Sequence, residues 1–441
     1  MSSSPILPIE ILENIVDLLS DDRVSLLRWA LVSRNFTARS QKYLFHRVRL
    51  GFPGTSENHF MSARISRFVD SLTPRLVRYI KHLSIYNYIE SSVPWLGHDR
   101  KLALLLPKIE KLESFTLSGP RDVAANKLSP NLLSVLITML ASAEVSEFNL
   151  FEIDSFPIAF LGRYCPCIRS ITFSLHRTST PDSGDNLSLP HLRVPTNAGF
   201  VERVVLCAAS TCFIAALYEE TKLPGTCLSF ARVQEIEVGS CDDSTLELIK
   251  KLLGDSAATP SLKKLSCNFR EVSDFSLSNF MQELHLIWLP CSLRKLQIEI
   301  LHETGAHFLD WLSVALLNSA EVEGGSRRPL EELVLVIHNK RFPDATATLW
   351  EAMDAQCAAL DRALSVPAYA VALRRVDIFV EVAREFFYTP YAKTQQNLME
   401  DEVFVSYFSR SIDDLYARLP RLRARGIVSV KWRIRRRGNA A

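Results

Sequence analysis

The chain has 441 residues, a net charge of +2 and a mean hydropathy of +0.07. Hydrophobic residues make up 47% and charged residues 23%, which excludes wholesale disorder and allows a sizeable buried core. Only 15 residues are glycine, which weighs against nucleotide-binding enzymes whose glycine-rich loops cradle phosphate. The near-neutral total gives no overall electrostatic field that would attract nucleic acid or a membrane.

Cysteine usage and hydropathy bear on the compartment. The nine cysteines are an odd number scattered between Cys165 and Cys357, which is unlike a secreted disulfide framework and favours a reducing compartment. The first ten residues, MSSSPILPIE, lack the basic and apolar parts of a signal peptide. The longest near-apolar run, residues 204–218, is shorter than a membrane span of about 20 residues. We therefore expect a soluble cytoplasmic or nuclear protein without a membrane partner.

The first 50 residues predict three short helices. Pro8 suits the first position of a helix, and apolar residues then recur on one helical face. Asp21 and Asp22 supply N-cap chemistry for a second helix, and a third is expected to run from Asn35 to Phe45. The apolar stripe of the second helix consists of Val24, Leu27, Leu31 and Val32. So small a unit has more apolar side chains than it can cover, so it needs a second surface from this chain or from a partner.

Two separated segments of this region match a known signature. Residues 7–12 read LPIEIL, and residues 25–36 read SLLRWALVSRNF. The first matches the LP-x-E-[IL]-L opening of the F-box family, and the second matches its VS-[RK]-x-[WF] element, with Phe36 where many members have tryptophan. Residues 1–50 therefore resemble an F-box module. Residues 43–50, YLFHRVRL, resemble the passage of fungal F-box segments from their last helix into a first strand.

The resemblance implies a function. F-box modules bind a Skp-family adaptor and through it a cullin, so the chain would be the substrate receptor of a ubiquitin ligase. Such a receptor has no catalytic residues and no cofactor, and it binds a protein substrate that this sequence does not identify. The adaptor-binding positions carried over from the family are Leu7, Pro8, Ile11, Leu12, Ile15, Leu26, Leu27, Val32, Ser33 and Phe36.

Short segments of alternating polar and apolar residues recur through the rest of the chain. Alternation over so few residues is typical of half-buried strands. The eleven segments are 83–85, 115–117, 148–150, 171–173, 204–206, 236–238, 265–267, 296–298, 333–335, 376–378 and 430–432. Several follow a similar lead-in, such as LPKIEKLE at 106–113 and TPSLKK at 259–264.

Helical patterns lie between these segments. Ser244 begins a capping box for a helix that Gly254 is expected to close, and Ser129-Pro130 opens another. Residues 308–317 and 345–364 have similar patterns. A repeated strand–helix unit cannot cover its apolar face alone, so neighbouring units must stack.

These patterns predict an α/β fold. We expect a three-helix module at 1–50, and over 51–441 a region that resembles an irregular leucine-rich-repeat solenoid with a curved parallel sheet. Residues 176–200 and 385–402 are predicted to be a surface loop and an insertion, and residues 340–441 to form irregular repeats. A doubly wound α/β domain is the structural alternative.

Catalytic and metal-binding motifs are poorly represented. The two histidines of HETGAH, residues 302–307, are five apart, whereas a zincin helix needs them four apart. Residues 165–167, CPC, and the pair Cys207 and Cys212 lack metal-ligand spacing, so we expect them to be buried core residues. We predict no metal site and no catalytic residue. An enzyme whose site is assembled from distant residues is an alternative.

Basic residues gather at the C-terminus. Residues 418–437 contain nine basic side chains and no acidic one. They indicate either a nuclear-localisation or phosphate-contacting patch, or an edge strand protected by its charges, with Trp432 in the core. For the helices at 1–50 the alternative function is a solenoid cap, in a repeat scaffold that binds a partner without any link to ubiquitin.

Overall fold

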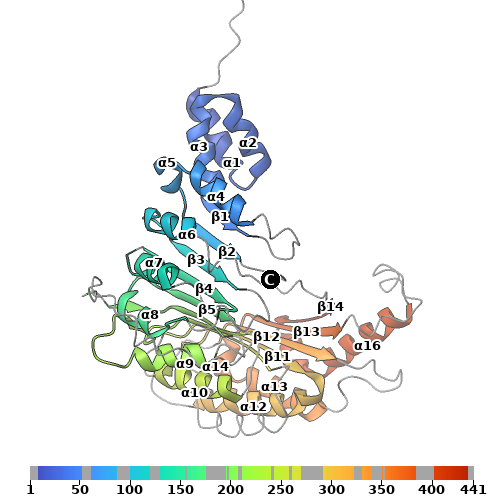
Figure 1. Ribbon diagram of the computed structural model, residues 1–441. Coiled ribbons are helices and arrows are strands. Elements are labelled where there is room, and N and C mark those ends of the chain that lie inside the picture. The colour runs from blue at the N-terminus through green and yellow to red at the C-terminus, as the bar shows by residue number, and fades with distance from the viewer. Residues whose placement is uncertain are drawn as a thin grey trace, which may run out of the picture. The chain divides into compact units, whose positions relative to one another are not determined.

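The computed structural model describes residues 8–51, 61–86, 100–119, 130–142, 144–153, 156–174, 195, 198–206, 211–239, 243–257, 261–269, 292–321, 330–339, 350, 353–383 and 402–435. The chain forms two compact units. Figure 1 labels their helices and strands. The first comprises Met1–Val201 and Cys212–Phe230, and the second comprises Glu202–Thr211 and Ala231–Ala441. Each unit contains parallel strands and helices, which confirms the α/β class.

The first unit begins with three helices and continues with strands that alternate with helices. Its helices are α1 (Ile9–Leu18), α2 (Arg23–Val32), α3 (Arg34–Leu44), α4 (Met61–Ser71), α5 (Pro74–Val77), α6 (Arg100–Leu105), the 3₁₀ helix η3 (Leu106–Lys108), α7 (Pro130–Ser142), α8 (Ala159–Tyr164) and, from Cys212 onward, α9 (Thr211–Glu220). Its main strands are β1 (Arg47–Leu50), β2 (His82–Tyr86), β3 (Ser114–Ser118), β4 (Glu147–Phe151) and β5 (Ser170–Ser174).

The five main strands of the first unit pair in parallel and in chain order, without a register slip. Each places two apolar side chains in the core, so Phe115 of β3 lies opposite Phe148 of β4 with ring centroids 6.1 Å apart. Figure 1 shows α6, α7 and α8 stacked side by side along this sheet. Gly51, directly after β1, has a φ of 90°, and a Cβ there would lie 2.0 Å from the Tyr86 carbonyl oxygen, so only glycine fits.

A second, very short parallel pair belongs to the first unit. It consists of β6 (Gly199–Phe200) and β8 (Leu228–Ser229). β6 falls at the end of the segment predicted to be a loop, so that prediction is wrong for its last two residues. Positions 176–194, 196 and 197 lie outside the described residues.

The second unit has seven parallel strands, again paired in chain order. They are β7 (Arg203–Leu206), β9 (Glu235–Val238), β10 (Lys264–Asn268), β11 (Lys295–Leu301), β12 (Glu332–Asn339), β13 (Arg375–Ala383) and β14 (Val428–Arg435). The helices are α10 (Asp243–Ala257), α12 (His302–Glu321), α13 (Asp354–Leu364), α14 (Pro367–Ala370), α16 (Glu402–Arg418) and α17 (Pro420–Ala424). β14 is an edge strand among the described strands, and Trp432 on it is only partly buried, not a full core residue.

A repeated main-chain arrangement links successive strands in both units. At nine places in the described residues, one carbonyl oxygen ahead of a strand accepts hydrogen bonds from two consecutive N–H groups at the start of a following strand, one from the residue before that strand and one from its first residue. The Lys81 oxygen, for example, accepts from Glu113 at 2.8 Å and Ser114 at 3.0 Å. In the first unit the acceptors are His46, Lys81, Glu113 and Ser146, and in the second unit they are Glu202, Gln234, Lys263, Arg294 and Glu331. The lead-in segments of the sequence supply these donors.

All eleven segments predicted to be strands lie in strands of the structure. The strand order does not reverse in either unit, as it would in a doubly wound sheet. Several predicted helix boundaries differ from the structure: α10 continues past Gly254 to Ala257, α12 extends beyond 308–317 at both ends, and α13 begins at Asp354, after a turn at Trp350. Positions 345–349 of the predicted helix at 345–364 lie outside the described residues. Positions 385–401 of the predicted insertion lie outside the described residues. The F-box and leucine-rich-repeat interpretations stay predictions.

Candidate functional site

The helices α1, α2 and α3 share a small apolar core. Trp29 of α2 meets Phe36 of α3 edge to face, with ring centroids 5.1 Å apart and an interplanar angle of 82°. The buried core residues are Val16, Leu26, Phe36 and Leu44, with Leu12, Leu19, Trp29, Tyr43 and Phe45 packed against them. These side chains come from all three helices, and α3 packs against both α1 and α2.

Side-chain caps set where α2 and α3 begin. The Oδ1 atom of Asp22 accepts hydrogen bonds from the N–H groups of Val24 and Ser25, each at 3.1 Å, as the sequence predicts. The third helix begins at Arg34, one residue earlier than predicted, because Ser33 caps it. Pro8 precedes α1 as its N-cap residue instead of occupying the first helical position.

A charged network joins α1 to α3. Arg39 donates to Asp17 through Nε at 2.7 Å and through Nη2 at 2.5 Å, and it also contacts Glu13. The Tyr43 hydroxyl donates to Asp17 Oδ1 at 2.8 Å. The hydrogen bonds from Arg39 favour the ionised carboxylate and lower the pKa of Asp17 to about 2. The two helices are thus held in one arrangement by more than their apolar contacts.

The side of α2 that faces away from this core is also apolar. Residues three, four and seven positions apart share one side of a helix, so Val24, Leu27 and Leu31 lie together. They are 59%, 49% and 88% exposed, whereas Leu26 on the opposite side is 1% exposed. Val32, at the end of the helix, is 73% exposed. The predicted stripe therefore faces solvent, and the opposite side of α2 packs inward.

Exposed apolar side chains are concentrated in this part of the chain. Among the described residues, seven of the eleven exposed large hydrophobic side chains lie between positions 9 and 32. Those outside the α2 stripe are Ile9, Ile11 and Leu18 of α1, and Leu18 is 85% exposed. Hereafter, "outer apolar face" means Val24, Leu27, Leu31 and Val32 of α2. Such a surface is typical of a protein-binding site, because single-chain proteins seldom leave grouped apolar side chains in water.

The residues predicted to bind an adaptor fall into three environments. The exposed ones are Pro8, Ile11, Leu27 and Val32, the partly buried ones are Leu12, Ile15 and Ser33, and the buried ones are Leu26 and Phe36. Leu7 lies outside the described residues. Leu26 and Phe36 support the helices from inside, so a partner that binds this fold would contact only the outer members directly.

The most exposed apolar residues are missing from the predicted positions. Leu31 and Leu18 exceed all the others of α1 and α2 in exposure, and Val24 follows Val32. The helical spacing of α2 did identify Leu31 and Val24 as members of its apolar stripe. Spacing alone could not indicate that the stripe faces outward, since α2 has apolar residues on both sides.

The structure also bears on the candidate metal ligands, the cysteines and the apolar segments. No group of three or more metal-ligating side chains capable of holding a metal occurs among the described residues. Cys165 is buried as predicted, but Cys167 is exposed and Cys212 only partly buried, so that prediction fails for these two; Cys207 lies outside the described residues. No helix in the described ranges is long and apolar enough to cross a bilayer.

One buried titratable cluster lies in the second unit. His338 on β12 stands between two carboxylates, with Nε2 3.3 Å from Glu299 on β11 and Nδ1 3.6 Å from Glu381 on β13. His338 and Glu381 are directly opposite in the strand register. The cluster thus brings side chains of three neighbouring strands together, with a hydrogen bond between His338 and Glu299.

The sequence was compared with protein-family models and with curated proteins. No protein-family model matches the chain, and no curated protein matches it.

Proposed function

We propose that this chain is the substrate-receptor subunit of a Skp/cullin/F-box ubiquitin ligase. In this proposal the α1–α3 module docks a Skp-family adaptor, and the parallel-sheet region binds a target protein. The observation that carries the proposal is the outer apolar face of α2, together with the two-part F-box-like signature in the same helices.

Docking would follow the physics of a helix entering an apolar groove. The side chains of Val24, Leu27 and Leu31 recur at helical spacing, which suits insertion along a partner's groove. Each apolar side chain that becomes fully buried contributes about 1.5–3 kcal/mol. The Arg39–Asp17 ion pair keeps α1 and α3 in place, so less ordering is required when the partner binds.

The receptor would act by proximity. A target bound to the sheet region would share one assembly with the charged ubiquitin carrier, which raises the effective concentration of a target lysine beside it. No residue of this chain needs to take part in bond making. The activity would therefore depend on two docking surfaces of the same chain.

A structural cap is the alternative function, and one observation favours it. Leu26 and Phe36, two of the family's docking positions, pack into the helical core. In this alternative α1–α3 only close the end of the strand array, in a scaffold without a ubiquitin link.

A pull-down with purified Skp-family adaptor separates the two functions. Leu31→Asp and Val32→Asp place a carboxylate on the outer apolar face without touching the core, and we expect each to abolish adaptor capture. Val371→Asp is the matched control, because Val371 is 91% exposed in the second unit. Circular dichroism checks that all variants keep their helices. Absent capture of the wild-type chain, or capture that survives both α2 substitutions, would overturn the proposal.

A further inference from the structure

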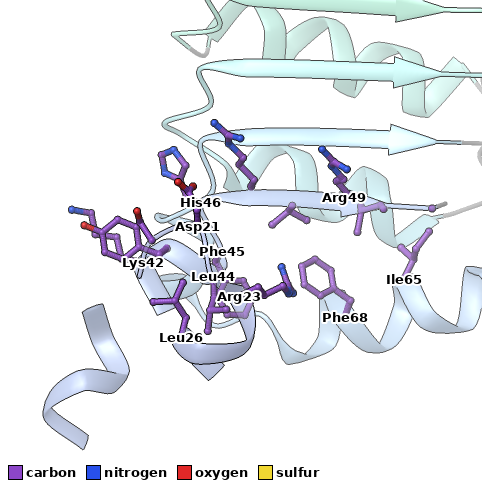
Figure 2. A pocket seen from close by; sticks show the side chains of 16 residues that line it. Asp21, Arg23, Leu26, Lys42, Leu44, Phe45, His46, Arg49, Ile65 and Phe68 are labelled. Atoms are coloured by element: carbon purple, nitrogen blue, oxygen red, sulfur yellow. The ribbon is translucent and has the colours of Figure 1, made fainter. Parts of the chain in front are cut away.

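A pocket of about 1060 Å³ lies beside β1 in the first unit (Figure 2). It is lined by all of β1 from Arg47 to Leu50 and by Ile65 and Phe68 of α4. In Figure 2, Phe68 and Ile65 of α4 lie along the side of β1 that is away from the rest of the sheet. The pocket therefore follows a strand edge.

The main chain of β1 has an unpaired side at this pocket. Among the described strands β1 pairs only with β2, and the His46 carbonyl oxygen accepts from the His82 N–H at 3.0 Å. Main-chain groups of successive strand residues point in alternate directions, so Val48 also faces β2. The N–H and C=O groups of Arg47 and Arg49 then point to the open side. Main-chain N–H and C=O groups that are unpaired along a strand edge can form hydrogen bonds with an added strand.

Positive charge surrounds the same edge. The side chains of Arg47 and Arg49 are exposed on one face of β1, and Arg23 and Lys42 also line the pocket. The lining contains a single carboxylate, Asp21. None of the four cations forms an ion pair with any residue that the structure describes. Their charge suits an acidic partner and repels a basic one.

The opposite face of the edge offers apolar contacts. Val48 and Leu50 of β1 are buried, and because they alternate with Arg47 and Arg49 they point to the face away from the arginines. Phe68 of α4 stacks on Phe45 with ring centroids 6.4 Å apart, and both rings are only partly buried. Side chains alternate between faces along a strand, so an added strand would present one set to the arginines and the other to these rings.

We propose that β1 accepts an extended acidic segment of a partner protein as an additional strand. The acidic side chains of that segment would lie on the face of Arg47 and Arg49, and its apolar side chains over Phe45 and Phe68. Main-chain hydrogen bonds to Arg47 and Arg49 would supply affinity, and the charges would select the sequence. The site uses the pocket beside β1 instead of the outer apolar face, so it does not depend on adaptor docking.

Fluorescence anisotropy with the full chain tests the proposal. The probe is a labelled octapeptide of alternating valine and glutamate, compared with its lysine analogue and with a version N-methylated on central residues of both edges. We expect the acidic peptide to bind. The lysine analogue, and the double variant Arg47→Glu/Arg49→Glu, should each weaken binding about tenfold or more. N-methylation should weaken it comparably, because it removes the main-chain donors.

Lys108→Glu/Lys111→Glu is the matched control, since both lysines are exposed in the first unit outside the pocket. This variant makes the same change in charge and should bind normally. Equal binding of the N-methylated peptide would overturn strand addition whether or not the arginine variant folds. Failure of the acidic peptide to bind, or its displacement by a short RNA at lower concentration than by unlabelled peptide, would also overturn the proposal.

Discussion

Arg39 of α3 and Asp17 of α1 form a two-pronged ion pair, with Nε–Oδ1 and Nη2–Oδ2 distances of 2.7 and 2.5 Å. The side chains are only about a third exposed, at 32% and 34%. Planar, paired hydrogen bonds of this type are stronger than single contacts of an ammonium group. This ion pair therefore links the first helix of the module to the third.

We expect Asp17→Asn to lower the melting temperature of the helical module at neutral pH. The folded pKa of Asp17 is about 2, below its ordinary value of 3.8, so ionised Asp17 favours the folded state. This stabilisation is complete above the unfolded pKa and is lost as the pH falls from about 4 through 2. The difference between wild type and variant should therefore shrink over that range.

Asp70→Asn is the control for this titration. Asp70 pairs with Lys101 on the surface of the same unit and is 61% exposed, so its replacement should change stability little. Melting curves recorded from pH 7 to pH 2 give both comparisons. An Asp17→Asn difference that stays constant with pH would contradict the assignment.

The two sides of α2 should respond in opposite ways to truncation. Leu26→Ala removes a side chain that is 1% exposed and should destabilise the module by about 2–5 kcal/mol. Leu31→Ala removes one that is 88% exposed and should change stability by no more than about 0.5 kcal/mol. Urea unfolding followed by circular dichroism measures both. Similar losses from the two changes would show that the outer apolar face is covered in solution.

Asp361 supplies a cap to a helix about 60 positions later in the chain. Its carboxylate, 3% exposed, accepts from the N–H groups of Arg421 at 3.2 Å and Leu422 at 3.0 Å, at the start of α17. Asp361→Ala leaves both N–H groups without their acceptor, the one of Leu422 in a buried position, and should cost about 2 kcal/mol. Denaturant unfolding of the second unit measures the loss.

Asp354→Ala is the comparison for the cap. Asp354 is 70% exposed and contacts Arg418, so we expect a loss below about 1 kcal/mol. If the two alanine variants unfold at the same denaturant concentration, the cap assigned to Asp361 contributes no more than a surface pair.

Cysteine alkylation should distinguish the thiols by burial. Burial raises the pKa of Cys267 and of Cys357 to about 12, so both remain protonated and shielded in the native chain. Cys167 is exposed and should react first with iodoacetamide among the described cysteines. Mass spectrometry of peptides from briefly treated native protein reads the order. Modification of Cys267 before Cys167 would contradict it.

Local patterns predicted much of the fold. The strands were found because each has two buried apolar residues separated by one polar residue, as in Leu83 and Ile85, and this alternation is local. The pair of strands β6 and β8 was not predicted, because two residues cannot establish a period. Gly254 did not end α10, since glycine at a helix end is only a tendency that packing can override.

The candidate site was less predictable. The cap at Asp22 followed from residue type, but the Ser33 cap of the third helix and the outward orientation of Val24 and Leu31 did not. Both sides of α2 are apolar, and only the packing of Leu26 against α1 and α3 decides which side is buried. Periodicity identifies a face without stating what covers it.

The carbonyl oxygens that receive two N–H groups from the following segment have an evolutionary consequence. Because this link uses main-chain atoms alone, each new strand takes its register from the backbone of the one before it and requires no particular residue there. Connecting segments can lengthen, shorten or change in sequence while the strands stay aligned. Whole strand–helix units could be duplicated or lost during evolution without a matching change in their neighbours' side chains.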